Sequence, residues 1–229
     1  MRLVACVSWG NWSLQPYDMW EISDALKLHR DFHEDDTPEL YVGAIDPLKV
    51  LPLESGSAWK RARRSTWDFL KKWGRIQRFA ENDSYKMLKK VDCHSELITL
   101  LRRHTILEDL SQPISYHNET RTIAGSMQFL MNEVADANPT RQNPVAASKL
   151  LHVTIPKLFT MFDNPMCNKF FRTRASVVVY CGLLLPLTQS QIKVLDRENI
   201  RPNQEKVCHD SWPKLVDEIN WTWARRKSA

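Results

Sequence analysis

The chain has 229 residues, of which 43% are hydrophobic and 26% charged, and it carries a formal net charge of +5. This balance is typical of a folded globular protein and excludes wholesale disorder. Only six residues are glycine, about 2.6% against a typical ~7%, and no two lie close enough for a Gly-x-Gly-x-x-Gly or Walker loop. A glycine cradle for a nucleotide phosphate is therefore excluded, we expect no cofactor, and the scarcity of tight turns favours helices.

Five scattered cysteines without a Cys-x-x-Cys pair favour a reducing cytoplasm over a disulfide framework. We expect no metal site, because His29 and His33 lie four residues apart without a third ligand nearby. The longest apolar stretch, Val177 to Leu187, is shorter than the roughly 20 residues that cross a bilayer. The first residues lack the length and cleavage site of a signal peptide. We therefore expect a cytoplasmic protein with no membrane contact.

Residues 1–56 differ from the rest of the chain. They hold three tryptophans, one expected helix from about Pro16 to His33, and a connection rich in proline and aspartate through residues 35–38 and 46–47. We predict a tryptophan-rich N-terminal extension over residues 1–56 and an all-helical domain over residues 57–229.

The excess positive charge is concentrated between Trp59 and Arg78, where eight basic residues accompany one acid. Apolar residues recur there at three- and four-residue steps, which predicts a helix over 59–80. Its other face carries the expected nucleic-acid-binding residues, Lys60, Arg64, Trp67, Lys71, Arg75 and Arg78. A basic stripe with an aromatic among its charges suits a phosphate backbone, so we expect DNA as the partner. The alternative is a solvated outer face without a partner.

The remainder predicts a mainly α, multi-helix bundle. After a turn over 81–84, we expect helices over 94–110 and 118–137, a loop over 137–144, and shorter helices over 144–153, 165–172, 175–185, 190–199 and 211–224. Asn143 as a cap and Pro144 in the first turn mark one helix start. Val177–Val179 is alternatively a strand. The sequence carries no signal for an oligomeric state.

One segment has the residues for chemistry. Lys149 follows small residues in the second turn of its expected helix, and Asp163 stands fourteen residues later at the start of the next. Apolar surroundings lower the pKa of a lysine and yield a free amine that attacks electrophilic carbon. A nearby aspartate can orient that amine, take its proton or stabilise an oxocarbenium-like centre. The alternative for Asp163 is a helix N-cap without chemistry.

This segment also carries a resemblance. Asn143-Pro144-Val145-Ala146-Ala147-Ser148-Lys149-Leu150-Leu151-His152, then Pro156, Leu158-Phe159 and Met161-Phe162-Asp163, resembles an uncharacterised group of prokaryotic helical proteins. That group reads small-Ser-Lys-hydrophobic-Leu-His, Pro-x-Leu-Phe and hydrophobic-Trp-Asp. Phe69-Leu70-x-Lys72-Trp73-Gly74 resembles the same group, so the likeness spans roughly residues 65–175. The group is more distantly similar to the helix-hairpin-helix DNA glycosylases, all-helical repair enzymes that flip a damaged base and cleave its N-glycosidic bond.

The resemblance implies roles for particular residues. In those glycosylases a lysine at the start of the second hairpin helix forms a Schiff base with the sugar, and an aspartate that opens a later helix assists. Lys149 and Asp163 match those places, while His152 and Phe162 are the implied pocket residues, with a core histidine as the alternative for His152. The likeness does not extend to the glycosylases' Gly-x-Gly turn, because residues 141–145 contain no glycine.

Two functions remain open at this stage. The first is a DNA glycosylase with lyase activity, in which an aromatic such as Trp67 or Phe162 recovers the energy of base flipping. The second is a non-catalytic helical module that binds nucleic acid or a protein. The first requires Lys149 and Asp163 to converge on one site that faces the basic stripe.

Overall fold

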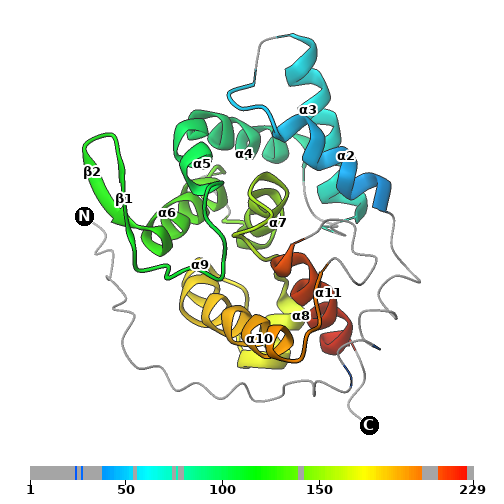
Figure 1. Ribbon diagram of the computed structural model, residues 1–229. Coiled ribbons are helices and arrows are strands. Elements are labelled where there is room, and N and C mark those ends of the chain that lie inside the picture. Colours follow the sequence, from blue (N-terminus) through cyan, green and yellow to red (C-terminus); the bar gives the residue numbers. More distant parts are fainter. Residues whose placement is uncertain are drawn as a thin grey trace.

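The computed structural model describes residues 38–53, 56–73, 76, 80–138, 142–202 and 211–225, with Asp24 and Lys27 in addition. The fold is mainly α, as predicted (Figure 1). The helices are α2 (Pro38–Leu48), α3 (Ser57–Asp68), α4 (Glu81–Cys93), α5 (Ser95–Leu101), α6 (Ile123–Ala135), α7 (Pro144–Thr154), α8 (Asn164–Phe171), α9 (Val177–Val179), α10 (Leu185–Arg197) and α11 (Trp212–Arg225). Two π-helical turns, η1 (Phe69–Trp73) and η2 (Tyr180–Leu184), continue α3 and join α9 to α10. Strands β1 (Pro113–Tyr116) and β2 (Glu119–Thr122) form a small hairpin.

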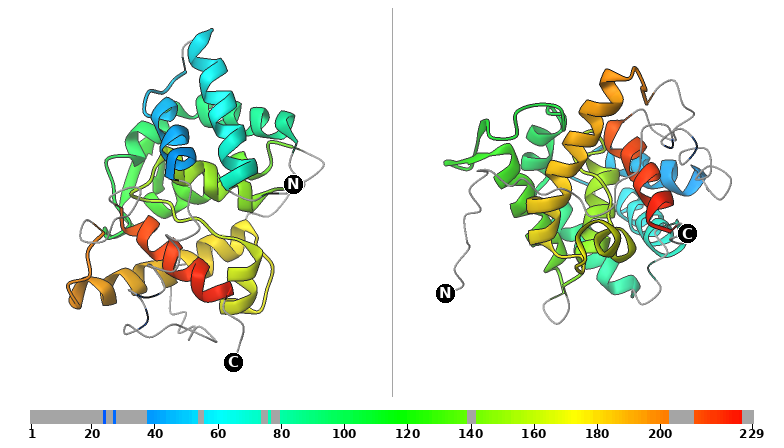
Figure 2. Two further views of the ribbon diagram at one scale, coloured as in Figure 1. Left: turned by 90° about the vertical axis from the view of Figure 1, so that its right-hand side faces the viewer. Right: turned by 90° about the horizontal axis from the view of Figure 1, so that it is seen from below.

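Helix α7 lies at the centre of the molecule, and every residue from Ala146 to Thr154 is buried. On one side it packs against α2, α4, α6 and η1. Helices α8 to α11 form the lower part of Figure 1, where α11 packs on α8 and α10. Helix α6 bridges the two groups through α9 and η2, so one core runs through both (Figure 2).

Helix α2 replaces a segment that the sequence predicted as a connection, and that prediction is wrong. Tyr41, Ala44, Ile45 and Leu48 recur at three- and four-residue steps and are buried in the core. The helix packs on α3 and α7, so part of the expected N-terminal extension shares the main core. The three tryptophans and the helix expected over 16–33 lie outside the described residues, except that Asp24 and Lys27 are helical.

The guanidinium of Arg102 joins the ends of two helices. It donates to the backbone oxygens of Leu48 and Lys49 after α2 and of Thr154 at the end of α7. These carbonyls have no partner within their own helices, so the arginine satisfies groups that helix ends leave open. Burial lowers the pKa of Arg102.

The expected helix over 59–80 is confirmed as far as Trp73 by α3 and η1. It does not reach Ala80, which is extended and caps α4. The predicted turn over 81–84 is wrong, because α4 begins at Glu81. Two acids in its first turn, Glu81 and Asp83, interact favourably with the helix dipole, and the core side begins at Ser84.

The helix expected over 94–110 ends as α5 at Leu101. Beyond it the carboxylate of Glu108 accepts hydrogen bonds from the Thr105 amide and the His104 ring, which stabilises a turn instead of a helix. The chain then forms the β hairpin where a helix start was predicted. His117 and Asn118 form its two-residue turn with φ of 47° and 63°, the left-handed values that such hairpins require.

Helices α6, α7, α8 and α11 confirm four expected elements, although α6 begins five residues later than predicted. The two helices expected over 175–185 and 190–199 are one run, Val177–Arg197, joined through η2, and Val177–Val179 is helical rather than a strand. By length and composition these 21 residues would also suit a membrane span, with 50% of the most apolar window buried inside the protein. Core helices of globular proteins share that composition.

Candidate functional site

Local sequence places Lys149 and Asp163 at defined points of α7 and α8. The Asn143 side chain accepts from the Ala146 amide at 3.0 Å and starts α7, which puts Lys149 in the second turn with 7% exposure. Asp163 is extended before α8, and its carboxylate accepts from the Met166 amide at 2.9 Å. The N-cap expected as the structural alternative for Asp163 is therefore present.

Ser148 holds the two segments together. Its hydroxyl donates to the Val145 carbonyl at 2.9 Å and accepts from the Phe162 amide at 3.3 Å. Lys149 directly follows Ser148 in the sequence, and Asp163 directly follows Phe162. The hydrogen bond between Ser148 and Phe162 therefore brings the predicted pair to one place. The charge of Asp163 acts on Lys149: desolvation lowers the pKa of the lysine, while Asp163 and Asp217 oppose that shift.

Helix α11 adds three buried charged residues that sequence reasoning did not identify as part of the site. Lys214 and Glu218 have no exposed surface and form an ion pair at 2.7 Å, and Asp217 is 4% exposed. Burial raises the pKa of Asp217 to about 7, although Lys214 and Lys149 favour its charged form. Together with Lys149 and Asp163, these residues form what we call the buried charge cluster.

The sequence gives no sign of this burial. Lys214 and Glu218 are four residues apart, which is the usual spacing of a surface ion pair on a helix. Their burial arises when α11 docks beside α8 and α10, more than sixty residues beyond Lys149.

The implied pocket residues are both buried. The Tyr41 hydroxyl lies 2.6 Å from Nε2 of His152. On the other side of the ring, Nδ1 lies 2.6 Å from the Phe159 carbonyl oxygen. Because a carbonyl only accepts, Nδ1 carries a proton, and in the neutral ring Nε2 is the acceptor for the Tyr41 hydroxyl. The ring of Phe162 packs edge-on against Tyr180 at 5.1 Å. These contacts fit the alternative of a core histidine at His152.

His152 also connects to the buried charge cluster. The ammonium of Lys214 lies 4.9 Å from the centre of the Tyr41 ring, whose hydroxyl bonds His152. Lys149 and His152 are one turn apart on α7, as Lys214 and Asp217 are on α11. Tyr41 of α2 therefore contacts both His152 of α7 and Lys214 of α11.

The expected basic stripe is only partly available for a phosphate backbone. Lys60 and Arg64 are exposed, and Trp67 is half-buried with the Lys71 ammonium 5.8 Å from its ring centre. Asp68 lies within ion-pair distance of both Arg64 and Lys72, at 3.9 and 3.1 Å. Glu81 pairs with Arg63 at 3.0 Å. Arg75 and Arg78 lie outside the described residues.

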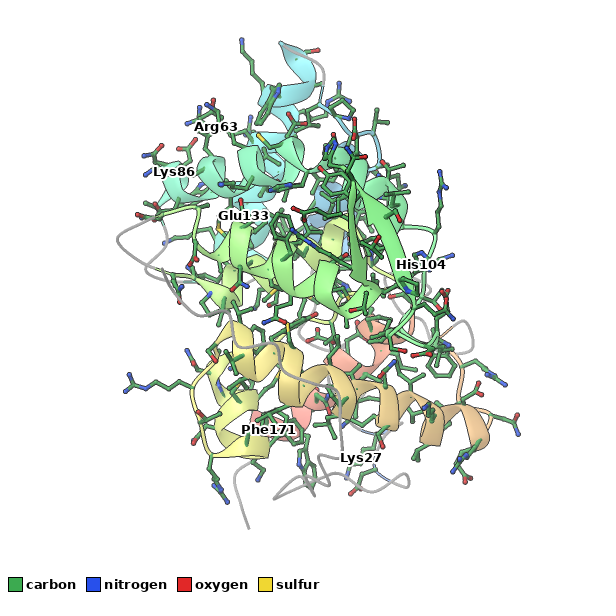
Figure 3. All side chains as sticks on the ribbon, turned by 90° about the vertical axis from the view of Figure 1, so that its left-hand side faces the viewer. Lys27, Arg63, Lys86, His104, Glu133 and Phe171 are labelled. Carbon is green, nitrogen blue, oxygen red and sulfur yellow. The ribbon has the colours of Figure 1, made fainter. Side chains whose placement is uncertain are left out.

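Helix α3, which carries most of the described stripe, lies apart from helix α8, which follows Asp163. Helix α3 lies at the upper end of the molecule, and α8 lies at the lower end (Figures 1 and 2). Figure 3 shows the same separation, with Arg63 of α3 near one end and Phe171 of α8 near the other. A DNA contact near Asp163 therefore needs positive charge from other elements.

Within the residues that the structure describes, no three histidine, cysteine, aspartate or glutamate side chains are placed to hold a metal ion. His29 and His33 lie outside those residues. Comparisons of the chain with protein-family models, with curated proteins and with solved structures find no match.

Proposed function

We propose that the chain is a DNA-binding protein with DNA base glycosylase and lyase activity, in which Lys149 attacks a flipped nucleotide. The observation that carries the proposal is the burial of the Lys149 amine within the electrostatic reach of Asp163 and Asp217. The mainly α fold and the resemblance of residues 65–175 to the group related to helix-hairpin-helix glycosylases support it. In this proposal the scaffold is of that glycosylase type.

The pKa of Lys149 explains why it is the nucleophile. Desolvation, with Arg225 and Lys214 in the same sense, lowers its pKa, so a larger fraction of the amine is neutral near pH 7. The neutral nitrogen forms a bond to C1′ of the sugar, and the C1′–base bond breaks. The base leaves with that electron pair and takes a proton from the Lys149 nitrogen. The lone pair of that nitrogen then breaks the C1′–O4′ bond, O4′ takes a proton from water, and an iminium remains between Lys149 and C1′.

Two carboxylates have separate tasks in this reaction. Asp217, with a pKa of about 7, is matched to accept the proton of the Lys149 ammonium near neutral pH. Asp163 is half-buried beside the site, and its carboxylate is placed to stabilise the positive charge that develops on the sugar. Because Lys149 is only 7% exposed, the reaction includes an opening of the site that admits the nucleotide.

Borohydride trapping tests the proposal. The full chain is incubated with DNA that contains an abasic site or one of a panel of damaged bases, and the reduced protein–DNA adduct is measured on a denaturing gel. Wild type forms the adduct, and Lys149→Gln does not. Lys193→Gln, an exposed lysine on α10, is the matched control and traps like wild type.

Asp163→Asn separates catalysis from capping, because asparagine caps a helix as well as aspartate. We expect base release to slow by roughly 10²- to 10⁴-fold, the range for removal of a positioned acid–base group, without loss of stability. Trapping that persists in Lys149→Gln, or no trapping by wild type on any substrate, overturns the proposal.

A non-catalytic binding module is the second candidate, and one observation favours it. Asp163 already serves as the N-cap of α8, and a buried lysine among acids needs no reaction to explain its retention. DNA binding by wild type without any trapped adduct is the result that this candidate predicts.

A further inference from the structure

A basic hollow lies directly beside Asp163. It has a volume of about 960 Å³ and is formed by α8, the loop that follows it and the end of α11. Its lining residues are Asn164, Pro165, Asn168, Lys169, Arg172, Thr173, Arg174 and Ala224. Three of them are basic, two are amides, and the described lining contains no acid. Two of the lining residues, Asn164 and Pro165, directly follow Asp163 in the sequence.

Specific contacts shape this basic hollow. Arg172 ends α8 in the left-handed conformation, with φ of 53°, and turns the chain back. The Asn164 side chain then accepts from the Ala175 amide at 2.9 Å, which ties the loop that carries Arg172 and Arg174 to the first turn of α8. From the other side, the Lys169 ammonium lies 5.5 Å from the centre of the Trp223 ring of α11.

The charge of the basic hollow is less compensated than that of α3. Among the described residues, no carboxylate lies within 4.0 Å of the Arg172 or Arg174 guanidinium, and both side chains are exposed. On α3, by contrast, Asp68 and Glu81 pair with neighbouring basic side chains. Guanidinium groups bind phosphate through paired donors, and uncompensated ones attract it most strongly.

We propose that the basic hollow binds backbone phosphates of the DNA strand whose nucleotide reaches Lys149 and Asp163. The inference rests on the proposed function and adds where the strand lies. It assigns the main phosphate contacts to Arg172 and Arg174 beside the reactive pair, rather than to the stripe on α3 at the other end of the molecule.

The test is the salt dependence of DNA affinity in the full chain. The probes are a fluorescein-labelled duplex with a central tetrahydrofuran abasic analogue and the corresponding single strand, read by fluorescence anisotropy over a KCl series. Arg172→Asn with Arg174→Gln removes both charges, and asparagine tolerates the left-handed backbone at position 172. Lys193→Gln with Arg197→Gln removes two exposed charges from α10 and is the matched control.

Each phosphate contact contributes about 0.9 to the slope of log affinity against log salt for duplex DNA. The Arg172/Arg174 variant is therefore expected to lose about 1.8 from that slope and to bind roughly 10- to 100-fold more weakly at 0.1 M salt. The control variant keeps the wild-type slope to within about 0.5. Replacing KCl by inorganic phosphate at equal ionic strength is expected to cause at most a small loss of wild-type binding, because the DNA strand makes several phosphate contacts at once.

The outcomes distinguish this inference from the proposed function. Equal slopes for the two double variants overturn the basic hollow as a phosphate site, even when Lys149-dependent trapping is found. A phosphate-dependent loss of DNA binding that is equally large in wild type and in the Arg172/Arg174 variant also overturns it, because the competing anion then acts elsewhere. Loss of slope in the Arg172/Arg174 variant alone supports it, including when no adduct is trapped and only the glycosylase proposal fails. A wild type that binds neither probe overturns both.

Discussion

Helix α3 and the buried charge cluster both contain several charged residues, but they place them in opposite environments. Arg64 of α3 and Lys72 of η1 stand in solvent with side chains 88% and 64% exposed and share one acid, Asp68. In the cluster, Lys214 and Glu218 have no exposed surface. Water screens the charges of the first set, whereas burial in the second lowers the pKa of Lys149 and raises that of Asp217.

The comparison shows that the number of charges in a segment does not indicate where chemistry occurs. The segment of α3 and η1 has the densest positive charge in the sequence. Its ion pairs with Asp68 and Glu81, however, lie at the solvent-exposed surface. The buried charge cluster has fewer charges, but each charge acts strongly on its neighbours because little solvent separates them. Removal of one charge from each region measures this difference.

The largest effect on stability is expected at Lys214. Lys214→Met removes the ammonium that pairs with buried Glu218 at 2.7 Å, and breaking a buried ion pair typically costs about 3–5 kcal/mol in the free energy of unfolding. Urea denaturation followed by circular dichroism measures the loss. Lys214→Met combined with Glu218→Leu removes both charges and is expected to recover most of it. A single variant that loses less than about 1 kcal/mol would show that the pair is hydrated and would remove the contrast with α3.

A second prediction concerns Asp217 and pH. With a folded-state pKa of about 7 and an unfolded value near 3.9, the folded chain holds a proton that the unfolded chain has lost between about pH 4 and 7. Stability therefore falls as pH rises through this window, by up to about 1.4 kcal/mol per pH unit, and levels off above pH 7. Asp217→Asn is expected to abolish that fall in urea denaturation curves.

Lys149 makes the free energy of unfolding change with pH in the opposite direction, and at higher pH. Because its folded-state pKa is lowered, the unfolded chain binds the additional proton between that lowered value and about 10.5. Stability therefore rises with pH in this window, and Lys149→Met is expected to remove the rise. The same slopes in wild type and variant would contradict burial of the amine.

The smallest effects are expected on α3. Arg64→Gln and Lys72→Gln each remove one partner of an exposed, solvent-screened pair with Asp68, so the free energy of unfolding should change by no more than about 0.5 kcal/mol. Urea denaturation at low and high salt measures both variants. A loss comparable to that of Lys214→Met would show that the two regions do not differ as the structure indicates.

Local signals explain which elements could be predicted from the sequence. Helices α7 and α8 begin at Asn143 and Asp163, each a capping residue followed by proline within two positions, and both start where expected. Helix α2 and the hairpin were missed because Pro47 sits inside the former and no glycine marks the turn of the latter at His117 and Asn118. In both cases tertiary packing overrides weak local preference.

The candidate site divides in the same way. Lys149 and Asp163 were identified because they stand at recognisable places in consecutive helices, and Ser148 and Phe162 bring those helices together over a short stretch of chain. Asp217 could not be identified, because its raised pKa depends on burial by elements distant in sequence. The basic hollow depends on a loop that returns to its own helix through Asn164 and Ala175, a contact that residue spacing does not encode.

Arg102 bears on the order in which the chain assembles. Its acceptors at Leu48, Lys49 and Thr154 lie 54, 53 and 52 residues away, on both sides of it in the sequence. Two long loops must therefore close before one side chain can make all three bonds, and closure of such loops is slow because it costs chain entropy. We therefore expect those bonds to form late in folding and to break early in unfolding. The Arg102 bonds are therefore expected to slow unfolding of the native state more than they speed folding.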